Sequence, residues 1–445
     1  MISVRDCKAG GRLELNVLAL NSGSSSLKFG LYRVGPSRTD MLISGEAEGI
    51  GEAKGRFHAR DSQNNSLLSE AAAIPDQRDA VVRVAKLLAG STPDAIGHRI
   101  VHGGPKLRQH CLIDGVVLQQ LKTAAAFAPL HTPAALAVIR FAQDHFPGLQ
   151  QVACFDTTFH AEMPERARVL PLPREFRVAG IQRYGFHGLS CESIMNQLAE
   201  PPDRVIIAHL GNGASVTAVK NGKSIDTSMG LTPTGGVIMG TRSGDLDPGV
   251  LVYLAREKKF DAAMLEQLVD HRSGLLGISG VGSDMRALHE AAASNADARL
   301  AIEMFCYSVR KQIAAMIAAL GGLDLLVFTG GIGENDAEVR AAICGGLTWA
   351  GVNLSAPHNR LANCAPGDPP SRCRVDVLDS QEDEQIAPPY LGFGFTDPFP
   401  VARHPVVPVI GGSSASVTSH RPRSSASVLI LKPNSRHMLT MTEFF

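Results

Sequence analysis

The chain has 445 residues, of which 44% are hydrophobic and 19% charged, a composition that fits a large buried core and excludes general disorder. Its 43 Lys and Arg residues balance its 43 Asp and Glu residues, so the overall charge gives no attraction to nucleic acid or to an anionic membrane. Any anion site must therefore be local. The eight cysteines include no C-x-x-C pair, which favours reduced thiols over a zinc ribbon.

Targeting segments are not evident. The opening stretch, MISVRDCKAGG, lacks the apolar region of a secretory signal, and no apolar run approaches the roughly 20 residues of a membrane span. We therefore expect a cytoplasmic protein without nucleic-acid or membrane partners. A chain of this length predicts about two or three domains.

The first predicted element is a hairpin in LNVLALNSGSSSLKFGLY, residues 15–32. Apolar strands at 17–20 and 27–32 flank a turn of small polar residues. A helix is predicted at 76–89, followed by a strand at 95–101.

A second helix and strand follow. In PLHTPAALAVIRFAQ, Thr132 is predicted to be the N-cap of a helix, with Pro133 at its first position. QVACFD, residues 151–156, reads as a buried strand that ends in Asp156.

The later part of the chain repeats this style. Residues 203–226 again give an apolar run, a small polar turn and an apolar run, followed by an Asn-Gly hairpin turn. A helix is predicted at 297–320 and a strand at 323–328. Asn335 and Glu338 have the spacing of a capping box that opens a further helix.

The repeated hairpin predicts mixed α/β layers in two related halves, with a cleft between them. The end of the chain breaks the pattern. Residues 388–445 are rich in Pro, Gly and Ser, and we expect most of them to be poorly structured.

Three glycine-rich turns end apolar strands, at 21–26 (NSGSSS), 211–215 (GNGAS) and 330–335 (GGIGEN). Backbone N–H groups in such turns can surround phosphate oxygens. A single turn of this kind is more often only a turn. None matches the Walker A or G-x-G-x-x-G pattern, so a nucleotide would require another kind of fold.

Charged residues in glycine-rich or apolar surroundings are the second candidates. Arg99 and Arg242 are strong ones, because an arginine in such surroundings usually needs an anionic partner. Asp156, at a strand end, suits either a metal or catalytic ligand or a plain salt bridge. A single histidine is more often a hydrogen-bonded structural residue, and Glu382 by itself reads as surface. The histidines in question are His98, His102, His131 and His187.

Several segments of the chain together resemble the acetate kinase family. They span about residues 15–387 and follow one another in the same order as in the family. The segments that carry the resemblance are LNVLALNSGSSSLKFGLY, AIGHRIVHGG, VACFDTTFHAEMP, RYGFHG, AHLGNGAS, DTSMGLTPTGG, GTRSGDLDP, SGLLGISGVGSDMR and VFTGGIGEN.

The resemblance implies a duplicated α/β fold of the actin, sugar-kinase and heat-shock-chaperone ATPase type, with the nucleotide in an interdomain cleft. The first domain would span 13–157 and be completed by about 381–387. The second, ATP-binding domain would span 158–380, and 388–445 would be an atypical tail. Family members are homodimers that use ATP and Mg²⁺, or Mn²⁺ in its place, to make acetyl phosphate from acetate reversibly.

Site residues carried over by motif fall into four groups. Catalytic roles would belong to Asp156, His187, Arg242 and His131. Acetate would be bound by Arg99 and enclosed by Val101, Leu130, Phe186 and Pro233. Magnesium would be held by Asn21 and Glu382. ATP and its phosphates would meet Ser24, Ser26, Lys28, His209, Leu210, Gly211, Asn212, Gly213, Asp284, Met285, Arg286, Gly331, Ile332, Gly333, Glu334 and Asn335.

Acetate is ionised at pH 7, so its attack on phosphorus needs no general base. We therefore expect Asp156 to order the arginines and metal-bound water rather than accept a proton. Val101 suits a methyl group, although a propionate or other short-chain carboxylate kinase stays open as an alternative. The foreign residues after Ala387 leave open a weakly active nucleotide-binding relative.

Four positions depart from the family's usual residues: Pro105, Thr132, Gln182 and Cys191.

Overall fold

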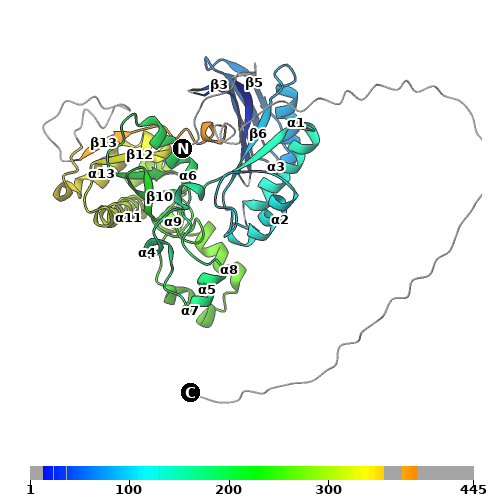
Figure 1. The fold of residues 1–445 in the computed structure, drawn as a ribbon. Coiled ribbons are helices and arrows are strands. Elements are labelled where there is room, and N and C mark those ends of the chain that lie inside the picture. Colours follow the sequence, from blue (N-terminus) through cyan, green and yellow to red (C-terminus); the bar gives the residue numbers. More distant parts are fainter. Residues whose placement is uncertain (1–13, 24, 37, 130, 355–372, 388–445) are drawn as a thin grey trace, which may run out of the picture. The chain divides into compact units, whose positions relative to one another are not determined.

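The structure, a computed structural model, consists of two mixed β-sheets with packed helices (Figure 1). The residues that it describes are 14–23, 25–36, 38–129, 131–354 and 373–387. The predicted tail lies outside these residues.

The first sheet has the strand order β5-β4-β3-β2-β1-β6-β8-β7. Its strands are β1 (Leu15–Ser22), β2 (Ser26–Val34), β3 (Thr39–Glu48), β4 (Arg56–Asp61), β5 (Ser66–Ala71), β6 (Ala95–Ile100), β7 (Cys111–Leu112) and β8 (Gln150–Phe155). Between them lie α1 (Gln77–Leu87), α2 (Gly115–Ala124), the 3₁₀ helix η1 (Ala125–Phe127) and α3 (Thr132–His145).

The second sheet has the order β11-β10-β9-β12-β13. Its strands are β9 (Arg204–Leu210), β10 (Ala214–Lys220), β11 (Lys223–Thr227), β12 (Leu325–Thr329) and β13 (Arg374–Val377). The α-helices of this part are α4 (Glu165–Arg168), α5 (Arg174–Val178), α6 (Gly188–Gln197), α7 (Pro248–Glu257), α8 (Ala262–Glu266), α9 (Gly274–Ser279), α10 (Met285–Ala292), α11 (Ala296–Leu320), α12 (Gly330–Asn335) and α13 (Ala337–Gly345). Short 3₁₀ or π turns are η2 (Thr158–His160), η3 (Gln267–His271), η4 (Thr348–Ala350) and η5 (Glu384–Ile386).

The two sheets share one topology. In each, a hairpin (β1–β2 or β9–β10) is antiparallel, and its first strand then pairs in parallel with a later strand, β6 or β12. A further parallel strand, β8 or β13, follows in the same direction. The order β3-β2-β1-β6-β8 therefore repeats as β11-β10-β9-β12-β13, which confirms the duplicated fold predicted from the two hairpins.

Glycine closes both hairpin turns. The Gly23 N–H donates to the Ser26 carbonyl at 2.9 Å, and a Cβ on Gly23 would lie only 2.8 Å from Ser26 Oγ. In the second sheet, the Gly211 N–H donates to the Gly213 carbonyl at 3.0 Å. The Asn-Gly turn after β10 has positive φ at both residues, as its sequence predicts.

Most predicted elements are present with nearly the predicted bounds. Helix α1 is capped by Asp76, whose carboxylate accepts the Asp79 N–H. Helix α11 is capped by Asn295 and ends at Gly321, which has φ 74°.

Two helix starts were predicted wrongly. Helix α3 has His131, not Thr132, at its N-cap, because the Thr132 N–H already donates to the Ala128 carbonyl in the preceding turn. Asn335 does not cap α13. It belongs to the helical turn α12, and the chain becomes extended at Asp336, whose carboxylate accepts the Val339 N–H. GGIGEN is thus a turn of helix rather than an open loop.

Among the described residues, Cys111, Cys154, Cys191, Cys306 and Cys344 are free thiols. No helix within the described part of the chain is long and apolar enough to cross a membrane.

Candidate active site

Adjacent parallel strands of the first sheet bring three predicted site residues to one edge. Asn21 is near the end of β1, Arg99 is near the end of β6, and Asp156 directly follows β8. Because β1, β6 and β8 are neighbours and run in parallel, their carboxyl ends meet. The sequence separations of these residues are large, but the sheet order makes them contacts.

Arg99 is the centre of this cluster. Its Nε donates to Asp156 Oδ1 and Oδ2 at 3.2 and 3.1 Å, and its Nη2 donates to Oδ2 at 2.7 Å. Its Nη1 donates to Asn21 Oδ1 at 3.1 Å, and Nη2 lies 2.9 Å from Glu382 Oε1. The guanidinium thus holds two carboxylates and an amide from distant parts of the chain.

The segment that carries Glu382 is packed on the first sheet. Ile386 and Ala387 are fully buried against Val17 and Ala19 of β1. A Cβ on Gly97 would lie 2.5 Å from the Ile386 carbonyl oxygen, so only glycine lets this segment lie on β6. The QEDEQIA stretch is therefore an ordered part of the site, where sequence alone read Glu382 as surface.

Burial disfavours the charged forms of Asp156 and Arg99. Asp156 is 1% exposed. Burial raises the pKa of Asp156 to about 6, although the Arg99 guanidinium lowers it; Glu382 adds to the rise. Burial also lowers the pKa of Arg99, but the charges of Asp156 and Glu382 outweigh it, and the net shift is upward. Both members of the pair are therefore charged at pH 7.

The oxygens of Asn21 and Glu382 fit a magnesium ion. Within the described residues, Glu382 Oε1 is buried and has no hydrogen-bond partner, although Arg99 Nη2 lies 2.9 Å away as an ion-pair partner. Oxygen ligands suit Mg²⁺, which usually takes one or two protein groups and fills its shell with water and phosphate oxygens. No group of three His, Cys, Asp or Glu side chains in the described ranges could hold a metal by itself, so the metal would depend on such outside ligands.

The second half of the chain brings two donors together at the turn after β9. A Cβ placed on Gly213, in the turn after β9, would lie 3.3 Å from both Arg242 Nη1 and His187 Nε2. Arg242 is steadied by donating from Nη1 to the Pro233 carbonyl at 3.1 Å. His187 has φ 58°, an unusual conformation for a non-glycine residue, and stands directly before α6. A backbone conformation of this kind often marks a functional site.

The histidines near these arginines are neutral at pH 7. Burial, followed by the charges of Arg242 and Arg99, lowers the pKa of His131 to about 4. Burial, His209 and the same arginines lower the pKa of His187 well below its usual value. His187 Nδ1 shares a hydrogen bond of 3.0 Å with Ser215 Oγ, and its ring stacks on His209 at 4.2 Å. Each can thus offer an N–H without a net charge.

A cavity of about 950 Å³ lies beside the second sheet. Eight of the predicted ATP residues line it: Gly211, Asn212, Asp284, Met285, Arg286, Gly331, Ile332 and Asn335. Its other lining residues, Ser283, His289, Asp336, Ala337 and Glu338, were not predicted. The lining residues come from the β9–β10 turn, the start of α10 and the α12–α13 region, which are far apart in sequence.

Other predicted ATP residues have different contacts. His209 stacks on His187 and bonds to Ser190 Oγ at 2.8 Å. Glu334 Oε1 accepts the N–H groups of Gly330 and Ser380 at 2.8 and 2.9 Å. Leu210, Gly213 and Gly333 do not line this cavity. These residues support the site's shape, and their contact with a nucleotide stays a prediction.

The remaining residues that were predicted to meet the ATP phosphates belong to the first hairpin and its turn. Lys28 pairs with Asn21 across the β1–β2 ladder, and Ser26 opens β2. Ser24 lies outside the described residues.

The predicted acyl wall is partly in place. Phe186 is buried in the core of the second sheet, and Val101 packs against that core. Pro233 is tied to Arg242 by its carbonyl. Leu130 lies outside the described residues.

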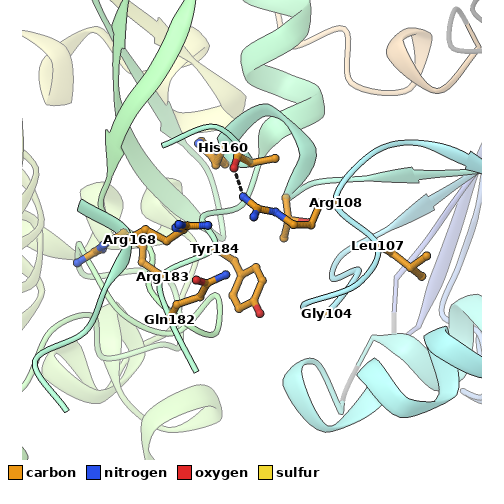
Figure 2. A pocket seen from close by; sticks show the side chains of 10 residues that line it. Gly104, Leu107, Arg108, His160, Arg168, Gln182, Arg183 and Tyr184 are labelled. Atoms are coloured by element: carbon orange, nitrogen blue, oxygen red, sulfur yellow. Dashed lines mark hydrogen bonds between the residues drawn. The ribbon is translucent and has the colours of Figure 1, made fainter. Parts of the chain in front are cut away.

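Figure 2 shows a much smaller cavity, of about 10 Å³, which has room for roughly one water molecule. Its lining includes Gln182, one of the four departures from the family pattern, Tyr184 and Arg108, which donates to the Ala161 carbonyl. The departure at Gln182 therefore falls outside the contacts of Arg99. Pro105 packs against Gly180, and Cys191 is buried beside Thr217.

Sequence reasoning missed one residue of the cluster. Asp383 Oδ1 accepts a hydrogen bond of 2.6 Å from Asn21 Nδ2. Its only signal in the sequence is its place in the acidic run that contains Glu382.

The fold defines a class, that of proteins with the duplicated actin-like ATPase fold. The sequence pattern of the acetokinase family matches residues 16–388. The chain is 40% identical over 400 residues to an acetate kinase from Solibacter usitatus, covering 84% of this chain and 97% of that protein. The chain belongs to the acetokinase family.

Solved structures of acetate and propionate kinases have a similar fold. An acetate kinase from Porphyromonas gingivalis superposes with a TM-score of 0.75 at 36% identity, covering 85% of this chain and 99% of that one. A propionate kinase from Francisella tularensis superposes with a TM-score of 0.78 at 37% identity, covering 84% and 98%.

Proposed function

We propose that this chain transfers the γ-phosphoryl group of ATP directly to acetate, giving acetyl phosphate and ADP, in a reversible Mg²⁺-dependent reaction. The observation that carries the proposal is the convergence of Arg242 Nη1 and His187 Nε2 at the Gly213 turn. That turn adjoins Gly211 and Asn212, which line the cavity suited to a nucleotide.

Charge neutralisation is the chemistry these residues can perform. Phosphoryl transfer spreads negative charge over the phosphoryl oxygens, and fixed donors at that place lower the barrier. Arg242 supplies a charge, and neutral His187 and His131 supply N–H groups. Asn21 and Glu382 would hold Mg²⁺, which would neutralise the charge of the nucleotide phosphates.

Arg99 is the predicted acetate ligand, but most of its hydrogen-bonding capacity is already in use. Its Nε and Nη2 face Asp156, and Nη1 donates to Asn21. Acetate would therefore accept a hydrogen bond from one remaining N–H of a terminal nitrogen, rather than a bidentate pair from the guanidinium. Asp156 would keep the guanidinium in that orientation.

The assay that tests the function is acyl-phosphate formation by the full chain with Mg²⁺ and ATP, trapped as hydroxamate. We expect product from acetate, with propionate lower in kcat/KM by about tenfold or more, because a methylene misfit is worth roughly 1–3 kcal/mol. Absence of product above background would instead support the weakly active nucleotide-binding relative.

Propionate is the second candidate, since one similar structure is a propionate kinase. Val101→Ala tests the pocket. We expect it to raise the propionate-to-acetate ratio of kcat/KM, with Leu300→Ala, an exposed position on α11, as the matched control. A wild-type preference for propionate would contradict the acetate assignment.

A homodimer is the assembly that the surface supports. Helix α7 exposes Val250 and Tyr253, which are three residues apart and so lie on one side of the helix, and none of its residues is buried in this chain. An amphipathic helix normally buries its apolar side against something, and a second copy would cover these residues. Tyr253→Glu should shift the chain from dimer to monomer in light scattering after gel filtration, whereas Glu257→Gln should not. A monomeric wild-type chain would contradict this.

A further inference from the structure

The amide of Asn21 is held at both ends. Its Oδ1 accepts from Arg99 Nη1 at 3.1 Å, and its Nδ2 donates to Asp383 Oδ1 at 2.6 Å. An asparagine amide can be reversed by a half-turn, which exchanges oxygen for nitrogen. Arginine only donates and an ionised carboxylate only accepts, so these two partners together admit a single orientation.

Asp383 is fixed independently of Asn21. It immediately precedes the η5 turn, and that turn is anchored by Ile386 and Ala387 in the core under β1. Gln385 of the same turn accepts a hydrogen bond of 2.9 Å from Asn196 on α6. The carboxylate is thus a rigid reference point for a side chain on the β1 hairpin.

The orientation has a consequence for the neighbouring oxygens. With Nδ2 turned to Asp383, Asn21 Oδ1 faces the same guanidinium as Glu382 Oε1, at 3.1 and 2.9 Å. The reversed amide would present N–H groups toward Arg99, and two donors facing each other repel. It would also replace an oxygen ligand by a nitrogen that cannot bind a hard cation.

We propose that Asp383 is a positioning residue that fixes the Asn21 amide with its oxygen beside that of Glu382. The proposal rests on the proposed function, in which these two oxygens serve the metal and phosphate end of the site. It assigns a role to the acidic residue next to Glu382.

The test exchanges the two groups. Asp383→Asn leaves a neutral partner that can itself reverse, so Arg99 alone then opposes reversal of the Asn21 amide. Asn21→Asp places a carboxylate against Asp383 at hydrogen-bond distance. In the double variant Asn21→Asp with Asp383→Asn, the new amide can donate to the new carboxylate, whose other oxygen faces Arg99 again.

The readout is equilibrium Mn²⁺ binding in the presence of ADP, measured by electron paramagnetic resonance without turnover. We expect each single variant to bind Mn²⁺ about tenfold more weakly, and the double variant to return to within about threefold of wild type. ADP affinity without metal should stay unchanged. Glu384→Gln, the next residue on the turn, is the control and should leave Mn²⁺ binding unchanged.

Two outcomes would overturn the proposal: an unchanged Mn²⁺ affinity in Asp383→Asn, or losses that add in the double variant. If Asp383→Asn does not fold, Asp383→Glu, which keeps a carboxylate acceptor, should bind Mn²⁺ within about threefold of wild type, and a loss there would count against it. Failure of wild type to form acetyl phosphate would refute the proposed function, while recovery of Mn²⁺ binding in the double variant would still support the positioning role.

Discussion

The two sheets have the same strand order but opposite chemistry at their hairpin ends. The first gathers ionised groups, with Arg99 between Asp156 and Glu382. The second gathers glycines and neutral side chains, such as Gly211 and the hydrogen-bonded pair His187 and Ser215. A duplicated backbone therefore fixes where strands end, while single residues at those ends decide what each end does. We infer that charge chemistry belongs to the first sheet and nucleotide binding to the second.

The largest expected effect concerns Arg242, the cation that the second half supplies beside the Gly213 turn. Arg242→Ala should lower kcat for acetate by about 10²–10³-fold, because a fixed donor to the phosphoryl oxygens is lost. The KM for acetate should change far less. Steady-state kinetics in both substrates measures this, and a change confined to the acetate KM would refute the role.

Asp156→Asn tests the role of the charged cluster on the first sheet. Loss of the charged partner leaves Arg99 less well placed, and kcat/KM for acetate should fall by about 10–10²-fold. ADP affinity, which we assign to the second sheet, should stay within about threefold.

The pH dependence separates positioning from base catalysis. Burial raises the pKa of Asp156 to about 6, so the carboxylate that orients Arg99 is lost as pH falls through this value. A positioning role predicts that equilibrium acetate binding weakens over the same range in wild type but not in Asp156→Asn. If acetate binding stays constant over this pH range and only kcat falls, the result would favour Asp156 as a general base.

The smallest effect concerns stability. Strand β6 carries the buried His98, whereas the corresponding strand β12 is wholly apolar apart from Thr329. Burial lowers the pKa of His98 to about 4. Between pH 6.5 and that value, the unfolded chain binds a proton that the folded chain does not, so the free energy of unfolding falls as pH falls.

His98→Gln should remove this contribution. Below about pH 6 its free energy of unfolding should fall less steeply than that of wild type, by up to about 1.4 kcal/mol per pH unit. Urea unfolding at several pH values measures the slope. Equal slopes for the two proteins would show that His98 takes up its proton in the folded state as well.

Much of the fold was predictable because its signals are local. Apolar runs ending in glycine-rich turns gave both hairpins, and Gly321 gave the end of α11. The two wrong helix starts share a cause. At Thr132 and Asn335 the backbone is already in a helical turn begun upstream, and a residue pattern does not reveal where a preceding turn starts.

The site was predictable where one residue in unusual surroundings carried the signal, as with Arg99 and Arg242. It was not predictable where the role depends on contacts between distant segments. Asp383 lies 362 positions from Asn21 and appears in sequence as part of a solvated acidic run. The hydrogen bonds that occupy Glu334 and His209 arise in the same way, from packing that no local pattern encodes.

The division between the sheets is tested most directly by titrating ADP into Arg99→Gln in a calorimeter, after confirming that the variant forms no acetyl phosphate. Arg99 belongs to the charged cluster of the first sheet and does not line the cavity beside the second sheet. We predict an ADP affinity within about threefold of wild type. Loss of ADP binding in parallel with turnover would contradict the division.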